Sequence, residues 1–184
     1  DYLLQNCINA RIDPYLYTQL YFNRVLRDIN GKGVLTRLTE ISEIVSSKMV
    51  DGVSVPCEGE LYYRGINVID LVNGFTNDNR FGFEETTYLL LFGKLPNKTE
   101  LADFEKILSG YRNLPKNFVR DVIMKKPSDD LMNNLARAIL NLYAYDSNAN
   151  DLSIPNVLRQ SLELIALFPM LAVYSYRAKS YYID

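Results

Sequence analysis

The chain has 184 residues, of which 48% are hydrophobic and 23% charged, and its formal net charge is −2. This length suits one ordinary domain, and the composition is that of a soluble globular protein rather than a disordered one. The small negative charge excludes a global positive field, so we expect no nucleic-acid partner.

Histidine is absent from the whole sequence, which limits the chemistry available to the chain. Imidazole is the commonest general acid or base near neutral pH, and it activates serine and cysteine nucleophiles. The two cysteines, Cys7 and Cys57, are too few for a disulfide framework and lack a metal-ligand spacing. We therefore expect reduced thiols, no metal site and a cytoplasmic location.

The first 30 residues are predicted to form a helical arm. Asp13-Pro14 is a typical helix start, and apolar residues then recur at helical spacing, which predicts a helix over about 14–29. Polar and charged residues interrupt every early apolar run, so no signal peptide is expected. Because the chain begins with Asp1 rather than Met, we expect it to be a piece of a longer protein.

Residues 31–66 carry the β-strand signals of the sequence. Four short β-prone runs lie at 34–36, 43–45, 53–55 and 61–63. Asp51-Gly52 favours a tight hairpin turn after the second run, and residues 56–59 are expected to separate the third run from the fourth. Strands this short cannot form a full layer, so we expect them to decorate a helical body.

Residues 67–184 are predicted to form that helical body. One helix opens at 83–85 and stops at Gly93, because glycine there allows a left-handed end. Residues 97–100 read as an N-cap with a capping-box glutamate. They are also a glycosylation sequon, but the cap accounts for them without a secretory compartment.

Three further helices are expected after residue 112. A short one lies near 116–126, with Phe118, Val122 and Ile123 pointing inward. Ser128 is predicted to cap a helix over 129–145. The last runs from 153 to about 181 and is apolar almost all round, which predicts a buried central helix rather than a membrane span.

Two acidic pairs, Glu84-Glu85 and Asp129-Asp130, suggest general acid and base chemistry at first sight. Adjacent helical residues point about 100° apart, so the two carboxylates of a pair do not share a site. Both pairs lie in first turns, where negative charge offsets the helix dipole, and we interpret them in that way.

The stretch from Glu58 to Pro96 joins an extended run to two helical segments in a specific order. It resembles the citrate synthase family, in which a G-x-L-x-Y-R-G segment precedes F-E-E-x-x-Y-L-L-L-x-G-x-L-P at about this separation. The main matching residues are Gly59, Leu61, Tyr63, Arg64, Gly65, Phe83, Glu84, Glu85, Leu95 and Pro96. The resemblance covers most of residues 31–184.

The resemblance implies a mainly α fold, the multi-helical large domain of citrate synthase type, with a few short strands near residues 34–66. It implies that residues 1–184 are an incomplete large domain and that the small catalytic domain is not present. Members condense acetyl-CoA with oxaloacetate and hydrolyse the thioester to give citrate and CoA. Two histidines, an aspartate and several arginines perform this chemistry, all beyond the matched region.

We therefore assign no catalytic, cofactor-binding or metal residue to this chain. Acetyl-CoA is expected only as a substrate of the full-length enzyme. Residues 146–158 contain no Lys or Arg, so no contact to CoA phosphate is matched there. Arg64 has two interpretations, a role for its charge or orientation of the strand-to-helix turn by bonds to carbonyls, and the second is favoured.

The resemblance also implies a homodimer formed through helices 116–126 and 129–145, where small alanines permit close helix packing. The interface candidates are Phe118, Val122, Leu131, Leu135, Ala136, Ala138, Ile139 and Leu142. Two alternatives stay open for function. One is 2-methylcitrate synthase, which uses propionyl-CoA on the same scaffold, and the other is a noncatalytic helical scaffold protein.

Overall fold

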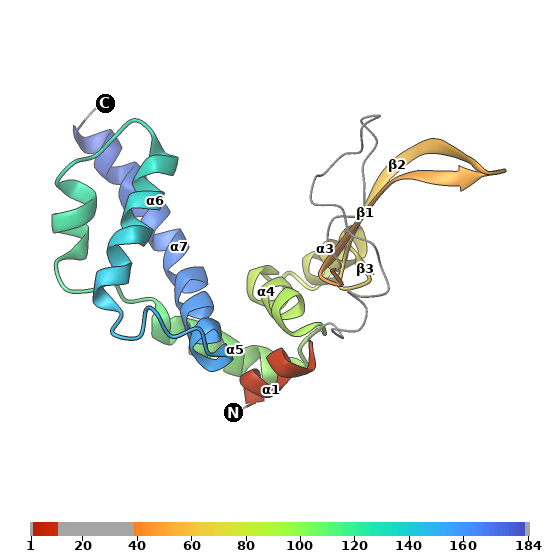
Figure 1. Ribbon diagram of the computed structural model, residues 1–184, viewed down its shortest axis with the longest axis horizontal. Helices are drawn as coiled ribbons and strands as arrows, with labels where there is room; N and C mark the ends of the chain where they lie inside the picture. Colours follow the sequence, from red (N-terminus) through yellow and green to blue (C-terminus); the bar gives the residue numbers. More distant parts are fainter. Residues whose placement is uncertain (1, 11–38, 183–184) are drawn as a thin grey trace. The chain divides into compact units, whose positions relative to one another are not determined.

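The computed structural model describes residues 2–10 and 39–182, which are mainly helical with one small sheet (Figure 1). The mainly α fold class predicted from the sequence is confirmed. The helix predicted over about 14–29 and the strand predicted at 34–36 lie outside the described residues.

Two units make up the chain, residues 1–101 and 102–184. The first unit contains α1 (Tyr2–Asn9), β1 (Ser42–Val50), β2 (Val53–Tyr63), β3 (Ile66–Asn67), α3 (Val68–Asn77) and α4 (Phe83–Phe92). Helix α5 (Lys98–Tyr111) begins in the first unit and ends in the second. The second unit continues with a π-helix (Val119–Met124), α6 (Leu131–Leu142), a 3-10 turn (Tyr143–Tyr145) and α7 (Ile154–Tyr182).

The sheet is antiparallel in the order β1-β2-β3, and both of its turns use two consecutive residues in the left-handed region. Asp51 and Gly52 have φ of 50° and 80°, and Arg64 and Gly65 have the same two values. Two-residue hairpins of this kind match the twist of the strands they join. The Asp-Gly hairpin predicted from the sequence is confirmed.

The strand break predicted at residues 56–59 is wrong, because β2 continues from Val53 to Tyr63. The register shifts between Val45 and Ser47 of β1, so residues 57–59 of β2 have no paired partner while the strands pair on both sides of them. Pro56 is tolerated because β3 pairs only with the last two residues of β2, so β2 has a single neighbouring strand at Pro56. Figure 1 shows the hairpin end of β1 and β2 extending away from α3.

Side-chain caps fix the starts of α3, α5 and α6. Asn67 caps α3 by accepting a hydrogen bond from the N–H of Ile69 at 2.9 Å. Asn97 accepts from the N–H of Glu100 at 2.9 Å, and the Asn97 N–H donates to the Glu100 carboxylate at 2.9 Å, which confirms the capping box. Gly93 ends α4 at φ 77°, as predicted.

The cap predicted at Ser128 is wrong, because Asp130 is the N-cap of α6 and accepts from the N–H of Asn133 at 2.9 Å. Ser128 instead accepts from the N–H of Asp130 at 3.2 Å. Its hydroxyl therefore shapes the turn before the helix, and the helix starts two residues later than predicted.

The second unit has a core between the π-helix, α6 and α7. Buried side chains from all three elements meet there: Phe118, Ile123, Ala138, Leu167, Leu171 and Ala178. The inward orientation predicted for Phe118 and Ile123 is confirmed, with exposures of 0% and 4%. The sequence therefore predicted which side of this element faces the core, although the element is a π-helix.

Helix α7 does not match the fully buried helix that its composition predicts. Eight of its 29 residues are buried, whereas Phe168, Val173 and Tyr176 are 42%, 59% and 54% exposed. By length and composition α7 is also the single described helix that could cross a membrane. In its most apolar 18-residue segment, 22% of the residues are buried. The core helix of a protein domain meets the same criteria. In α7, Leu167, Leu171 and Ala178 pack in one core with Ala138 of α6, so this helix packs on protein.

Candidate functional site

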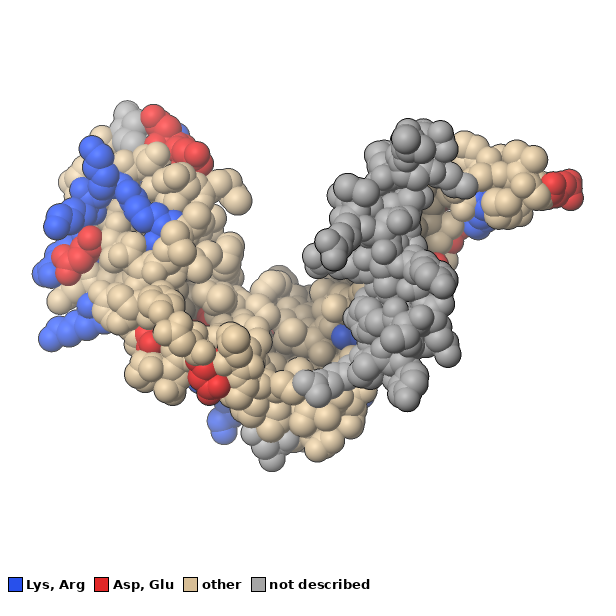
Figure 2. All heavy atoms as spheres, viewed as in Figure 1, with Lys and Arg blue, Asp and Glu red and all other residues tan. Residues whose placement is uncertain are grey.

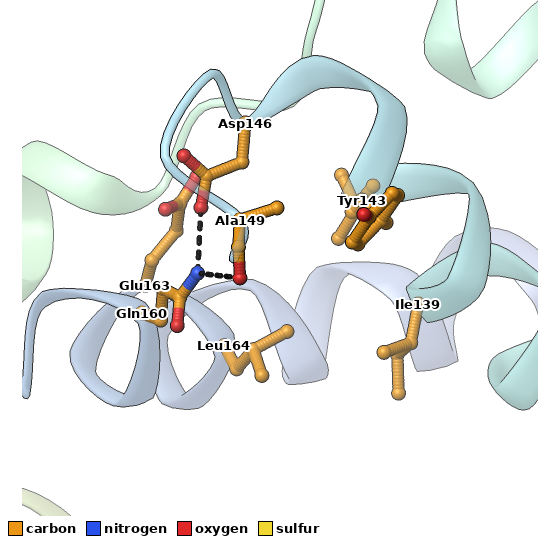
Figure 3. A pocket seen from close by; sticks show the side chains of 8 residues that line it. Ile139, Tyr143, Asp146, Ala149, Gln160, Glu163 and Leu164 are labelled. Carbon is orange, nitrogen blue, oxygen red and sulfur yellow. Dashed lines mark hydrogen bonds between the residues drawn. The ribbon is translucent and has the colours of Figure 1, made fainter. Parts of the chain in front are cut away.

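A pocket of about 220 Å³ lies in the second unit, where the chain turns from α6 into α7 (Figure 3). Apolar and polar side chains share its lining: Ile139, Leu142, Tyr143, Asp146, Ala149, Gln160, Glu163 and Leu164. Figure 3 shows the Gln160 amide directed at both Asp146 and the carbonyl of Ala149. The polar groups therefore gather on the side formed by the turn and the start of α7.

Asp146 is the most strongly perturbed acid of this pocket. Its carboxylate accepts from the Gln160 amide at 2.9 Å and from the Arg159 guanidinium at 2.6 Å, and the backbone N–H of Asn148 donates to it at 3.0 Å. These donors, Gln160 first, stabilise the charged form and lower the pKa of Asp146 to about 2. A carboxylate held this firmly in its ionised form is a poor general base near neutral pH.

The neighbouring side chains hold the turn itself. Asn156 is 8% exposed, and its amide donates to the carbonyls of Asn148 and Asp151, both at 2.8 Å. Arg159 also donates to the Asn156 side chain at 2.9 Å and to Glu163 at 3.0 Å. These side chains clamp the 146–151 turn to the start of α7, and the arrangement positions a loop rather than activating a reactive group.

This cluster was not predicted, because residues 146–158 contain no Lys or Arg. The cation that binds the turn is Arg159, one residue past the end of that range. The sequence did carry a signal for the cluster. An Asn- and Asp-rich turn at 146–151 is followed by Arg159 and Gln160 in the early part of the next helix.

A second polar network lies in the first unit around Tyr88, which is 0% exposed. The Tyr88 hydroxyl accepts from the amide of Asn6 at 3.1 Å and shares a short hydrogen bond with the hydroxyl of Tyr2. Tyr2 in turn donates to Glu100, and Lys94 donates to the same carboxylate at 2.9 Å.

This network links α1, α4 and the cap of α5 through two groups with shifted pKa values. Burial and the bond to Tyr2 raise the pKa of Tyr88. Lys94, Tyr2 and the Asn97 backbone lower the pKa of Glu100 to about 2. Glu100 was predicted only as a capping residue. Its bonds to Tyr2 and Lys94 could not be predicted from the four residues of the capping box.

Arg64 serves the turn rather than a ligand. Its Nε and Nη2 both donate to the carbonyl of Leu90, at 3.2 and 3.0 Å. That carbonyl lies in the last turn of α4, where acceptors lack partners within the helix and a cation suits the dipole. The favoured interpretation of Arg64 is therefore confirmed.

The acidic pairs do not form a shared site either. Glu85 binds Arg80, which also contacts Asp78 at 3.1 Å, and Asp130 is used as a cap. Among residues 2–10 and 39–182, no group of three His, Cys, Asp or Glu residues has a geometry that suits a metal ion.

Comparison with known proteins assigns the family. A family model described as the C-terminal domain of citrate synthase matches residues 30–182. The chain belongs to the citrate synthase family. A 2-methylcitrate synthase from Shewanella oneidensis is 34% identical over 121 residues, which cover 64% of this chain and 29% of the relative. A citrate synthase from Saccharolobus solfataricus is 30% identical over 140 residues, covering 76% of this chain and 34% of the relative.

Solved citrate synthases share the fold. The crystal structure of the enzyme from Pyrobaculum aerophilum matches with a TM-score of 0.63 and 26% identity, covering 84% of this chain and 38% of that chain. The enzyme from Thermoplasma acidophilum, in a ternary complex with carboxymethyl coenzyme A and oxaloacetate, matches in fold with a TM-score of 0.65 and 22% identity, covering 85% of this chain and 35% of that chain. The chain therefore spans about a third of the length of the family members it matches.

The residues that carry the family resemblance occupy structural positions. Gly59, Leu61 and Tyr63 lie in β2, and Arg64-Gly65 forms the turn to β3. Phe83 through Glu85 open α4, and Leu95-Pro96 connects α4 to α5. None of them lines the pocket at the α6–α7 turn.

The predicted dimer-interface residues divide between core and surface. Phe118 and Ala138, 0% and 1% exposed, are covered by the chain's own core and have no surface to offer a partner. Four more candidates are half-buried against the same core: Val122, Leu135, Ile139 and Leu142. Leu131 is half-exposed and Ala136 is exposed.

The exposed face of α6 carries an apolar stripe, of which the predictions named Ala136 alone. Met132 and Leu140 are 74% and 75% exposed, Tyr143 is 57% exposed, and Ala136 lies between them. Their spacing of four, four and three residues places them on one side of the helix. The stripe follows the same helical period as the other predicted residues of α6 but lies about 100° around the helix from them, on a neighbouring face.

Proposed function

We propose that this chain is part of the large helical domain of an enzyme that condenses an acyl-CoA with oxaloacetate, as citrate synthase does with acetyl-CoA. The observation that carries the proposal is the family match over residues 30–182. The fold shared with solved citrate synthases supports it.

A second candidate is 2-methylcitrate synthase, in which propionyl-CoA replaces acetyl-CoA. The relative from Shewanella oneidensis carries that name and is 34% identical, whereas the citrate synthase from Saccharolobus solfataricus is 30% identical. Identities this close do not favour one acyl group. Both candidates share the reaction class and differ only in the acyl pocket.

We infer that the chain alone is inactive, because the reaction requires histidines and this sequence has none. The two charged residues that could best serve a substrate already bind other groups of the chain. Arg64 binds the Leu90 carbonyl, and Asp146 is held ionised by Arg159 and Gln160. Neither is placed to bind a carboxylate substrate or to remove a proton.

An assay of CoA release, read from the free thiol, tests both the inferred inactivity of the chain and the identity of the acyl-CoA. The purified chain, mixed with oxaloacetate and either acetyl-CoA or propionyl-CoA, should release no CoA above background. Measurable turnover would refute the inferred inactivity. The protein encoded by the complete reading frame should release CoA, and the faster of the two acyl-CoAs identifies the candidate; no release with either supports the noncatalytic scaffold instead.

We further propose that the chain contributes to a homodimer through α6 and the 116–126 segment, with the α6 stripe as the apolar centre of the contact. The stripe suits an isologous interface because two copies of one helix face can pack on each other. Leu140→Asp should shift the mass measured by light scattering from dimer to monomer, and Asn141→Asp, an exposed position of α6 outside the stripe, should not. A monomeric parent protein would count against the proposal.

A further inference from the structure

Helix α1 is too short to be stable by itself, so its contacts with the rest of the first unit hold it in place. It has eight residues, whereas isolated helices shorter than about 12–15 residues are marginal in water. None of its residues is buried, and Leu3 and Leu4 are half-buried. The family match begins at residue 30, so α1 lies outside the matched region. The family match therefore gives no account of why this helix is docked.

Two polar side chains attach α1 to the helices beneath it. The Asn6 amide donates to the Tyr88 hydroxyl of α4 at 3.1 Å, and the Tyr2 hydroxyl shares a short hydrogen bond with the same oxygen. The Tyr2 hydroxyl also donates to the Glu100 carboxylate at the start of α5, and the Lys94 ammonium lies 5.8 Å from the centre of the Tyr2 ring. Because Tyr2 and Asn6 are four residues apart, both lie on one side of α1.

These groups form a relay of hydrogen bonds with one direction. A tyrosine hydroxyl has a single hydrogen, and Tyr2 gives its hydrogen to Glu100. The hydrogen between the two tyrosines therefore comes from Tyr88, whose oxygen accepts from Asn6. The relay thus runs from Asn6 through Tyr88 and Tyr2 to Glu100. Removal of the Tyr2 hydroxyl breaks two bonds of the relay at once, so most of this attachment depends on one group.

The helices beneath α1 have contacts of their own that do not need it. Glu100 keeps its bonds to Lys94 and to the Asn97 N–H, both at 2.9 Å, so the start of α5 stays capped without Tyr2. Helix α1 contains no Lys, Arg, Asp or Glu and is tan throughout in Figure 2, so it forms no ion pair. Water can replace its hydrogen bonds to Tyr88 and Glu100 when it leaves.

We propose that α1 is a strap, docked on α4 and the start of α5 by the Tyr2 relay, which opens as one unit while the rest of the first unit stays folded. Elements with few buried contacts open at a lower free energy than the whole fold. Opening uncovers the Tyr88 hydroxyl and the end of α4 at Gly93, beside which Ala10 lies. The proposal does not rest on the acyl-CoA reaction or on the dimer, because all its residues belong to the first unit.

Hydrogen exchange on the whole chain tests the strap. The amides of residues 6–10 should exchange at least about tenfold faster than those of residues 87–92 in α4, because only local opening is needed. Tyr2→Phe keeps the ring and removes two relay bonds, so exchange at 6–10 should rise about tenfold and exchange in α4 should not change. Asn6→Ala should raise it several-fold. Asn9→Ala is the matched control, because Asn9 is exposed and bonds only to Gln5 of α1 among the contacts described, so its effect should stay below about twofold.

The two thiols of the chain give a second measurement of the same opening. Cys7 lies in α1 and Cys57 in β2, and both are free and half-buried. In Tyr2→Phe, a maleimide followed by mass spectrometry should modify Cys7 faster than in the parent chain and Cys57 at the parent rate. Equal acceleration at both thiols, or equal exchange of α1 and α4 in the parent chain, would mean that α1 opens only with the whole unit and overturns the proposal. Equal effects of Asn6→Ala and Asn9→Ala, or no effect of Tyr2→Phe, also overturn it, because the relay then does not hold the strap.

Discussion

The two units of the chain each contain one carboxylate whose pKa is lowered to about 2, Glu100 in the first and Asp146 in the second. Both carboxylates accept from a cation, a neutral side chain and a backbone N–H. The two sites therefore use the same three kinds of donor for the same purpose, which is to fix a junction between helices.

The sites differ in how far along the chain their cations lie. Lys94 is six residues from Glu100, and Arg159 is 13 residues from Asp146. Glu100 also belongs to a capping box, with its backbone donor three residues away, although its third donor, Tyr2, is 98 residues away. Glu100 was predicted and Asp146 was not, because local spacing predicts a cap and cannot predict a clamp across a turn.

The largest effect should come from breaking the clamp in the second unit. Asn156→Ala leaves the carbonyls of Asn148 and Asp151 without their donor, and the unfolding free energy should fall by about 2–3 kcal/mol. Urea denaturation measures the loss, and hydrogen exchange should locate it in residues 146–153. Asn133→Ala, an exposed asparagine of α6, is the control, and an equal loss there would show that the clamp has no special role.

The corresponding change in the first unit should cost less. Tyr88→Phe removes one buried hydroxyl and its bonds to Tyr2 and Asn6, so the unfolding free energy should fall by about 1 kcal/mol. Hydrogen exchange should increase in α1 and stay unchanged in α7. Tyr176→Phe, an exposed position in the other unit, should have no effect; increased exchange in α7 after Tyr88→Phe would contradict the separate roles of the two networks.

The elements that the sequence predicted correctly are those whose determinants lie within a few residues. The Asp51-Gly52 hairpin, the end of α4 at Gly93 and the Asn97 capping box all depend on contacts spanning at most four residues. Each uses a backbone requirement that few side chains satisfy. Such local rules carry over directly from sequence to structure.

The candidate sites were predicted less well because they depend on which surfaces meet. The period of α6 identifies two apolar faces, but only the position of α7 shows that Ala138 is covered and Leu140 is not. The bond between Tyr2 and Tyr88 joins residues 86 positions apart, and that from Arg64 to Leu90 spans 26. Contacts at such separations leave no periodic trace in one sequence.

Arg64 offers a test of a contact that the sequence suggested and the structure defines. Arg64→Ala should lower the unfolding free energy by about 1–2 kcal/mol, because the Leu90 carbonyl loses its donor and φ stays at 50°. Arg64→Gly loses the same donor but tolerates the positive φ, so it should be about 0.5–1 kcal/mol more stable than Arg64→Ala. Thermal denaturation of the two variants compares them directly. Equal stability would mean that the left-handed backbone stores no strain at this turn.

The smallest effect should be the pH dependence that the two carboxylates share. Each folded-state pKa, about 2, lies below the ordinary values of 4.5 for Glu and 3.8 for Asp. Below those ordinary values the unfolded chain takes up protons that the folded chain does not. The stabilisation is therefore complete above about pH 4.5 and is lost as the pH falls toward 2. Urea denaturation from pH 6 to pH 2 should show this decline.

Glu100→Gln and Asp146→Asn remove the titration and keep an acceptor, so each should flatten the decline in its own unit. Gln also preserves the capping box, because its carbonyl oxygen can accept from the N–H of Asn97. If Glu100→Gln flattens the decline and Asp146→Asn does not, the clamp at Asp146 is weaker in solution than the junction at Glu100. The two junctions would then differ in strength although each carboxylate has the same three kinds of donor.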